Sequence, residues 1–415
     1  MVDAWRELAL LMGLAVYGLF SAPAPPEVGV AEAAVGLCLV VASGLRRPLA
    51  LVSGALVATP GARVHEAVGC VAFLVLLWLP LLRGAGLDWR GRDIVRDVVP
   101  LLFLFLPVML AGPLRPARGR AVALLTAGLS AAGVAFALRW WHDAGWAFGA
   151  IGHRAMSDGP RYLLNSPTVL FAALWLPMAA LRLAWPELGD GAAGLAPRGR
   201  LVRLALAVPV ALAALLILAA LAGAVHRMAL ILALVSLIGF LGWSLGRTVG
   251  PAAVALVALG ALLLSPGGPL AGAFELVVVK SEMVGFNERF AEADAVFAQI
   301  GRSPLSLLFG DGWGTLVANP AVGGWRVSYT HSFPSYLLLK TGVVGALAMA
   351  AWLGTLAPLA VNLARRDPPL ALAALPPVAG GLLLHTSFKY LCFGLLLTVL
   401  TLAGEEDAGQ RRDRR

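Results

Sequence analysis

The sequence predicts an all-α, polytopic membrane protein: a bundle of transmembrane helices with one long, partly helical loop outside the membrane. Of its 415 residues, 60% are hydrophobic and only 13% are charged, and the mean hydropathy is +0.84. A water-soluble domain carries about 25% charged residues, so much of this chain must face lipid. Long apolar runs along nearly the whole chain are the third observation, and they indicate where the helices lie.

A helix crosses the hydrocarbon core of a bilayer with about 20 apolar residues, in a usual range of about 17–25. Thirteen runs are candidate spans: 8–22, 28–44, 48–62, 66–82, 98–112, 119–138, 166–185, 201–221, 226–243, 248–265, 335–361, 369–386 and 388–403. Runs 48–62 and 98–112 are short, and we expect one of them to be re-entrant or part of a bent hairpin. Many apolar runs follow the first, which is therefore predicted to be a membrane helix and not a cleaved signal peptide.

Loop charges predict the orientation of the bundle. Alternate connections in the second half carry arginines: Arg198, Arg200, Arg203, Arg247, Arg365, Arg366, Arg411, Arg412, Arg414 and Arg415. Basic loops face the cytoplasm, so loops 139–165, 222–227, 266–334 and 386–388 are expected on the other side. The 32 basic residues against 23 acidic ones suit anionic lipid or a phosphorylated substrate. Nucleic acid binding is not expected, because no soluble basic domain is present to hold it.

The chain divides into four parts on this reading. They are N-terminal transmembrane helices 1–265, a loop 266–334, C-terminal transmembrane helices 335–403 and a cytoplasmic tail 404–415. Within the loop, apolar residues recur at helical spacing and predict an amphipathic helix on the outer face of the bundle. They are Phe286, Phe290, Ala293, Phe297 and Ile300. The stretch Gly310–Gly314 is predicted to be a flexible turn that leads toward His331.

His331 stands where the long loop re-enters the membrane. Imidazole titrates near pH 6.5, so it can take a proton from a hydroxyl group at neutral pH. The competing interpretation is a histidine that only caps the following helix or binds a backbone carbonyl. A catalytic carboxylate could come from the acidic loop residues, although a solvated loop face explains them equally well. They are Glu282, Glu288, Glu292 and Asp311.

Two arginines are predicted on the same side as His331. Arg227 begins an apolar run, and Arg289 lies on the predicted loop helix. A guanidinium group can bind a phosphate through two parallel hydrogen bonds. Arg227 could instead reach toward lipid headgroups, and Arg289 could pair with Glu292 three residues later. The shared location favours a common anionic ligand.

Other kinds of site are not expected. Four other histidines do not show metal-ligand spacing. They are His65, His142, His153 and His385. The stretch Gly310–Gly314 lacks the strand, lysine and Ser/Thr of a nucleotide-binding loop. The three cysteines lie in apolar runs and are interpreted as small hydrophobic residues; they are Cys38, Cys70 and Cys392.

The segment 222–360 resembles the bacterial O-antigen ligases and the related O-antigen polymerases. His331-Ser332, nine further residues and then Gly342-Val343-Val344-Gly345 are similar to that family's His-Asn/Ser, x9, Gly-x-x-Gly signature. Arg289 followed by Pro304 and Gly310–Gly314 is similar to an upstream segment of the same family. Arg227 resembles its arginine ahead of a leucine, although Ile231 stands where the family usually has leucine.

The resemblance implies about twelve membrane helices, cytoplasmic termini and a long periplasmic loop in a bacterial inner membrane. It also implies a metal-independent, inverting transfer of a glycan from undecaprenyl pyrophosphate. His331 would be the catalytic base, while Arg227 and Arg289 would bind the pyrophosphate. No cofactor is expected, since the pyrophosphate bond already activates the sugar.

The acceptor that we favour is lipid A-core, which would make the protein an O-antigen ligase. The alternative within the family is a growing glycan, as in an O-antigen or exopolysaccharide polymerase. A secondary transporter or lipid flippase is the alternative from another class. Such a protein would show inverted repeats and charges at mid-helix, and neither is evident in the sequence.

Overall fold

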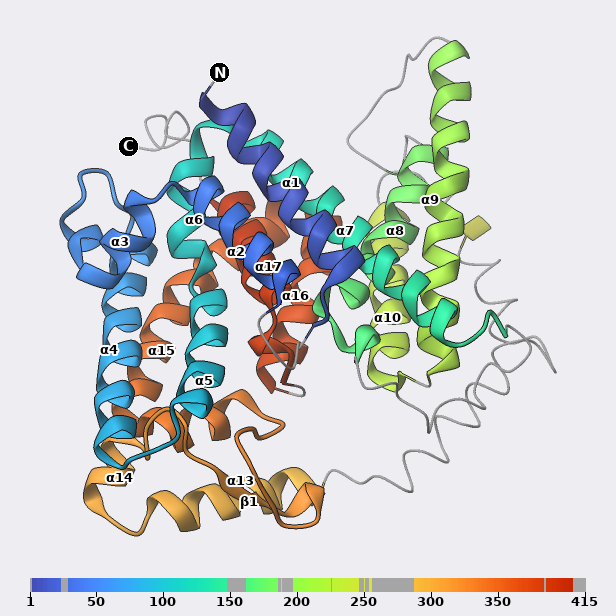
Figure 1. The fold of residues 1–415 in the computed structure, drawn as a ribbon. Coiled ribbons are helices and arrows are strands. Elements are labelled where there is room, and N and C mark those ends of the chain that lie inside the picture. The colour runs from blue at the N-terminus through green and yellow to red at the C-terminus, as the bar shows by residue number, and fades with distance from the viewer. Residues whose placement is uncertain are drawn as a thin grey trace.

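The computed structural model of the chain describes residues 2–23, 29–147, 162–185, 188, 197–224, 226–245, 250, 254–255, 287–383 and 386–405. These residues form an all-helical bundle with one small β-hairpin at one end (Figure 1). The main helices are α1 Val2–Phe20, α2 Val30–Ser43, α3 Arg46–Ser53, α4 Val64–Gly86, α5 Gly91–Leu104, α6 Leu106–Leu114, α7 Arg118–Asp143, α8 Pro167–Ala184, α9 Pro197–Gly223, α10 Arg227–Leu245, α13 Asn287–Ile300, α14 Pro304–Phe309, α15 Phe333–Arg366, α16 Pro368–Leu383 and α17 Leu391–Gly404. Short 3₁₀ turns are η1 Ala55–Ala58, η2 Arg115–Ala117, η4 Leu163–Asn165, η6 Pro320–Val322 and η7 Thr386–Lys389. Strands β1 Val317–Asn319 and β2 Trp325–Val327 pair antiparallel, with Ala318 opposite Arg326.

Within the described residues, six helices are long and apolar enough to cross a membrane, or seven if one bent pair forms a single span. By helix length and hydropathy, the chain is a multi-pass membrane protein. The thirteen spans expected from hydropathy and the twelve or so implied by the resemblance are therefore both wrong. Counting apolar runs overestimates spans because a run ends at any polar or helix-breaking residue, whereas a helix continues through many of them.

Particular runs show where that count fails. Runs 98–112 and 119–138 belong to one apolar helical stretch, Gly91–Asp143. Run 48–62 falls on the second arm of the α2–α3 pair, which is bent by 89°. The last two runs correspond to α16 and α17, which have 16 and 14 residues and fall short of a full span. Run 248–265 lies almost entirely outside the described residues.

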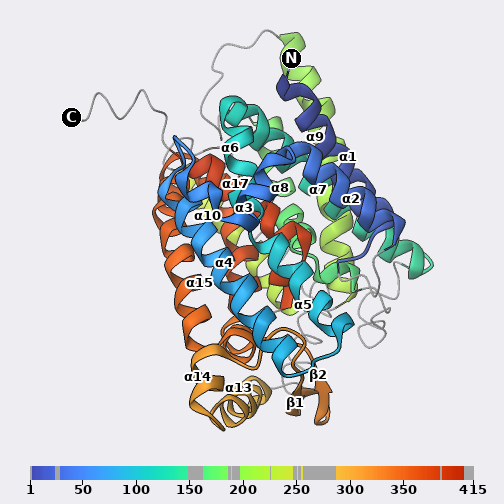
Figure 2. The same ribbon diagram turned by 60° about the vertical axis from the view of Figure 1, so that its left-hand side comes forward.

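The two ends of the bundle carry different elements. At one end, basic residues surround the carboxylate of Glu405 (Arg115, for example, binds both of its oxygens at 2.9 Å). Arg366, at the end of α15, donates to the Glu405 carbonyl at 3.0 Å. The opposite end carries α13, α14 and the hairpin (Figures 1 and 2). We call these the Glu405 end and the His331 end.

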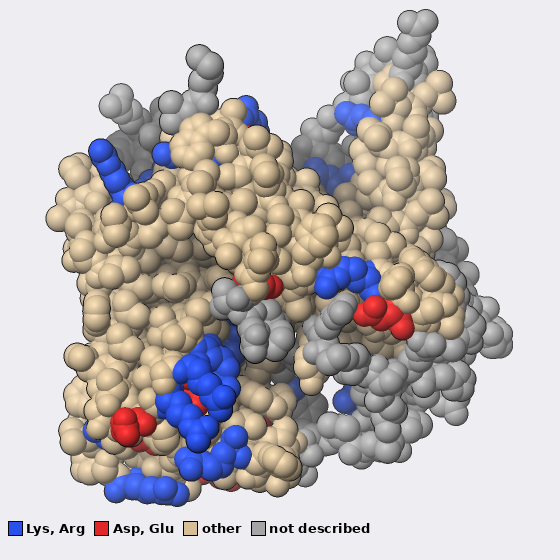
Figure 3. Space-filling model, viewed as in Figure 1, with Lys and Arg blue, Asp and Glu red and all other residues tan. Residues whose placement is uncertain are grey.

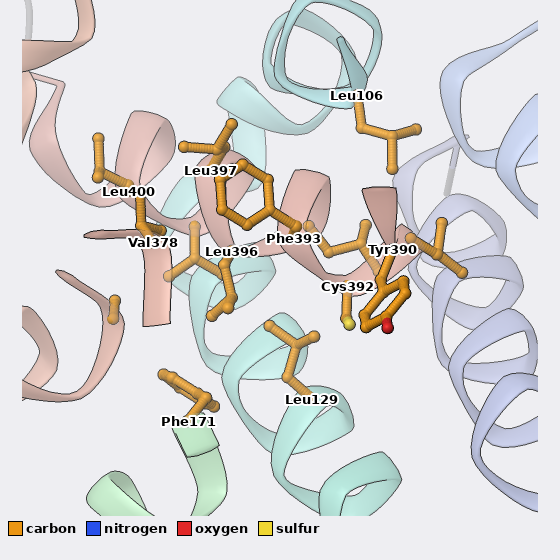
Figure 4. Packing of buried hydrophobic residues seen from close by; sticks show 14 of the residues in the cluster. Leu106, Leu129, Phe171, Val378, Tyr390, Cys392, Phe393, Leu396, Leu397 and Leu400 are labelled. Carbon is orange, nitrogen blue, oxygen red and sulfur yellow. The ribbon is translucent and has the colours of Figure 1, made fainter. Parts of the chain in front are cut away.

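Helix α17 lies in the middle of the core. Nearly all of its residues are buried, because α5, α6, α7, α8, α15 and α16 all pack around it. Figure 4 shows Phe393 and Leu397 of α17 among side chains of the neighbouring helices, which include Leu106, Leu129 and Val378. A helix of only 14 residues can therefore be deeply buried without spanning a bilayer by itself.

Residues 310–315 form a docked plug and not the flexible turn predicted from their glycines. The Trp313 side chain is 1% exposed. Its indole Nε1 donates to the Leu76 carbonyl at 2.9 Å, and its backbone amide donates to the Pro80 carbonyl at 3.0 Å. Pro80 has no N–H, so the Leu76 carbonyl lacks its usual helical donor. The plug thus supplies the hydrogen-bond donor that Pro80 cannot give to the Leu76 carbonyl of α4.

Helix α15 receives the other side of the plug at a break in its backbone. Gly342 has φ +62°, a conformation that is costly for residues with a Cβ. Next to this break, the Leu339 and Lys340 carbonyls accept from the amides of Asp311 and Gly312 at 3.0 and 3.1 Å. A Cβ on Gly342 would lie 2.4 Å from the Gly310 nitrogen. The glycine therefore serves both the backbone turn and the close approach of the plug.

Replacing Gly342 with alanine should destabilise the protein and release the plug. The positive φ alone costs about 1–2 kcal/mol for an L-residue, and the contact with Gly310 adds to this. Thermal unfolding in detergent and protease cleavage within 310–315 measure the two effects. Gly354→Ala is the matched control, since this helical glycine of α15 has no neighbour within 4 Å. Equal stability of the two variants would contradict this role of Gly342.

Helix α13 lies across the His331 end and falls within the predicted amphipathic segment, but its buried face matches the predicted one only at Ile300. Phe290 and Phe297, which the pattern placed on the buried face, are 71% and 54% exposed. The buried residues are Glu292, Val296 and Ile300. A hydrogen-bonded carboxylate takes the buried position because it has partners there, which apolar spacing does not reveal.

Candidate active site

His331 lies between the β-hairpin and α15, two residues before the helix begins. Its ring Nδ1 is 2.6 Å from Oε1 of Glu292 on α13, and its backbone amide donates to Oε2 at 3.0 Å. The Glu292 side chain is 2% exposed, whereas that of His331 is 35% exposed. The carboxylate is therefore buried behind a histidine that still reaches the surface.

A third residue fixes the carboxylate. The Asn319 side-chain amide, at the end of β1, donates to Glu292 Oε1 and also to the Tyr329 carbonyl at 3.3 Å. Burial opposes ionisation of Glu292, but its hydrogen bonds with His331 and Asn319 outweigh this and hold the pKa of the carboxyl below its ordinary value. Glu292 is thus ionised at neutral pH.

The geometry determines what the imidazole can do. An ionised carboxylate only accepts hydrogen bonds, so Nδ1 of His331 must donate to Glu292, and this assigns the tautomer. Nε2 then carries the lone pair and can accept a proton. A histidine oriented by a buried carboxylate is the arrangement that general-base catalysis uses, because the carboxylate also stabilises the imidazolium that forms.

Replacing Glu292 with glutamine should lower kcat and leave KM unchanged. The substitution keeps an oxygen acceptor for His331 but removes the charge that stabilises the imidazolium. A positioned base contributes about 10²–10⁴-fold, and we expect a loss of roughly tenfold or more from this change. Asp294→Asn, on the exposed face of the same helix, is the control. A variant with wild-type kcat would contradict the positioning role.

The two predicted arginines lie on different helices: Arg289 is on α13 together with Glu292, and Arg227 is on α10. Arg289 is on α13, three residues before Glu292, a spacing at which side chains lie on neighbouring parts of a helix surface. Arg227 is the first residue of α10, which packs against α8, α9 and α16. The α9–α10 turn lies toward the His331 end of the bundle (Figure 1). Their binding of a common anion stays a prediction.

A buried ion pair joins α5, α15 and the plug next to the site. The Lys340 ammonium, on α15, lies 2.5 Å from Oδ2 of Asp97 on α5, and the two side chains are 0% and 1% exposed. Lys340 also donates to the Thr315 carbonyl at 2.6 Å, and the Gly314 amide donates to Asp97 at 2.9 Å. The pair therefore links both helices to the plug. This pair is not evident from the sequence, because 243 residues separate the partners.

A small cavity of about 20 Å³ lies beside this ion pair. Apart from Asp97 and the Tyr336 hydroxyl, its walls are apolar. They include Trp313 of the plug, Phe333 and Met349 of α15, and Phe388 of η7. The cavity is about the size of one water molecule, and it lies where α5, the plug, α15 and η7 meet.

An arginine cluster, which the sequence reading did not single out, lies at the same end. Arg90, Arg92 and Arg96 are exposed at and near the start of α5, where Figure 3 shows basic side chains gathered on the surface. Arg96 pairs with Asp93 at 2.9 Å. A cluster of this kind attracts anions.

The described residues contain no group of three His, Cys, Asp or Glu side chains that could hold a metal ion. Neither the known family models nor the curated proteins include a match to this chain. The fold and the Glu292–His331 pair therefore define a multi-pass membrane protein with a candidate general base at one end of its bundle.

Proposed function

We propose that this protein is a membrane glycosyltransferase that moves a glycan from undecaprenyl pyrophosphate to an acceptor hydroxyl group. The observation that carries the proposal is the hydrogen bond between His331 and the buried carboxylate of Glu292. This pair provides a base at the boundary of a bundle of membrane helices, where a lipid-linked substrate and water are both accessible. The resemblance of 222–360 to the O-antigen ligases supports the choice of substrate.

The mechanism follows from the tautomer. His331 Nε2 takes the proton of the acceptor hydroxyl group. At the same time, the hydroxyl oxygen bonds to the anomeric carbon of the donor sugar. The bond from that carbon to the phosphate oxygen breaks, and its electron pair leaves with undecaprenyl pyrophosphate. Glu292 offsets the charge of the imidazolium. Arg227 and Arg289 are the proposed ligands of the pyrophosphate, whose negative charge grows as the bond breaks.

The proposed setting is a bacterial inner membrane with the His331 end in the periplasm. The arginines around Glu405 suit the cytoplasmic side. Lipid A-core is the favoured acceptor, and a growing glycan is the alternative. The reaction uses neither a nucleotide nor a cofactor, because the donor is already activated.

Purified protein in proteoliposomes tests the proposal directly. The donor is a defined glycan on undecaprenyl pyrophosphate, supplied with lipid A-core, with a free glycan acceptor or with none. Glycan on lipid A-core identifies a ligase, and longer lipid-linked glycan identifies a polymerase. Movement of intact donor between leaflets, without glycan transfer, would identify a flippase and overturn the proposal.

A further inference from the structure

Lys389 is a cation that the predicted site did not include. It ends η7, the turn between α16 and α17 at the His331 end. Its ammonium lies 4.0 Å from the centroid of the Tyr336 ring and 5.9 Å from those of Tyr329 and Phe388. Aromatic faces attract a cation but do not neutralise its charge. Within the described part of the chain, no hydrogen-bond acceptor or carboxylate contacts this ammonium.

The neighbouring carboxylate is already used. Asp97 binds Lys340 and the Gly314 amide through Oδ2, and the Tyr336 hydroxyl at 3.4 Å through Oδ1. One negative charge therefore faces two lysine ammonium groups, and the Asp97–Lys340 pair leaves the Lys389 charge in excess. Lys389 is half-buried, and a partly desolvated cation is stabilised when an anion joins it.

The titration of Lys389 agrees with this charge balance. Burial lowers the pKa of its ammonium from 10.5 to about 7; Asp97 raises it in part, while Lys340 and Arg96 lower it further. At neutral pH the Lys389 side chain is thus present in both its protonated and its neutral form. A bound anion would favour the charged form, so anion binding and protonation of Lys389 are coupled.

Lys389 is also close to the proposed base. The Tyr329 ring meets the His331 ring edge-on, with centroids 5.9 Å apart, and the Lys389 ammonium lies 5.9 Å from the same ring. Phe388 and Tyr336, whose rings contact the Lys389 ammonium, also line the small cavity between α5, the plug and α15. Lys389 thus lies near Tyr329, which contacts the proposed base, and near two aromatic side chains that line the cavity.

We propose that Lys389, at the end of η7, binds the pyrophosphate of the lipid-linked donor. This inference rests on the proposed function and adds a ligand to the same site. When the bond between the anomeric carbon and the phosphate oxygen breaks, the departing oxygen keeps the electron pair. The Lys389 ammonium stabilises that charge, while the acceptor proton goes to His331.

Lys389→Met and Lys389→Arg test the proposal in the proteoliposome assay. Methionine keeps the length and apolar body of the side chain, whereas arginine keeps the charge. Loss of a charge-assisted hydrogen bond weakens binding by about 10- to 100-fold, so KM for the donor should rise by that factor in Lys389→Met and less in Lys389→Arg. The acceptor KM should not change. Arg302→Met removes an exposed arginine at the same end and is the control.

The pH dependence adds an independent readout. The wild-type donor KM should rise as pH increases above about 7, since Lys389 then loses its proton, whereas the Lys389→Arg variant should lack this component. Equal donor KM in wild type and Lys389→Met would overturn the inference while leaving the transfer reaction established.

Direct binding keeps the two proposals separable if no transfer is seen. Undecaprenyl pyrophosphate in neutral vesicles is titrated against wild type and both variants, with Trp fluorescence as the readout, and phosphatidylglycerol vesicles form the comparison. Weaker binding of the pyrophosphate lipid alone in Lys389→Met supports the anion site. An equal loss with phosphatidylglycerol, or no loss, overturns it.

Discussion

Replacing His331 with alanine should lower kcat by about 10²–10⁴-fold, the contribution of a positioned general base. The acceptor hydroxyl would lose its proton acceptor, while the donor would still bind through cations on other elements. Folding should be nearly intact, because the His331 side chain is 35% exposed and precedes α15. Turnover of a defined lipid-linked glycan in proteoliposomes gives kcat, and thermal unfolding reports on the fold.

His142→Ala is the matched control for this loss, since His142 is an 80% exposed histidine on α7. It should transfer glycan at the wild-type rate. If His331→Ala also retained near-normal turnover, the Glu292–His331 pair would be a structural contact only, and the mechanism built on it would fail.

Replacing Lys340 with methionine should cause the largest loss of stability, roughly 3–5 kcal/mol, which is the usual cost of breaking a buried ion pair from one side. The Asp97 carboxylate would be left buried without its cation, and the Thr315 carbonyl would lose a donor. The plug 310–315 would then be held less firmly against α5 and α15. Thermal unfolding in detergent, followed by Trp fluorescence, measures the change.

The double variant Lys340→Met, Asp97→Asn separates charge from packing. It leaves no buried charge, and asparagine keeps an oxygen for the Gly314 amide. Most of the lost stability should return, since removing both charges of a buried pair is far less costly than removing one. A double variant as unstable as the single one would show that the lysine acts through packing and not through its charge.

Features that depend on local sequence were predictable, and those that depend on tertiary pairing were not. Apolar composition alone indicates a helical membrane protein, and the structure has long apolar helices that agree with it. The number of spans was not predictable in this way, because helices such as α17 are short, apolar and buried among others. Hydropathy does not distinguish such a helix from one that crosses a bilayer.

The site shows the same division. His331 was singled out because a polar histidine beside an apolar run is visible in the sequence. Glu292 was only one of several acidic loop residues, and its burial depends on Asn319 and His331, which lie 27 and 39 residues away. Lys389 was missed because its environment is formed by rings from the hairpin and α15. Apolar spacing on α13 did not predict its buried face, because the partners that bury Glu292 lie outside that helix.

The Trp313 contact with α4 has a consequence for the order in which the protein is made. Helix α4 leaves the ribosome more than 200 residues before Trp313 does. Through that interval the Leu76 carbonyl, which Pro80 deprives of its helical donor, has no plug to bind. In hydrocarbon such a group is costly, so water or a headgroup must satisfy it at first. The plug takes over this carbonyl once residues 310–315 have been made, so the site is completed only after α13, the plug and α15 have followed α4.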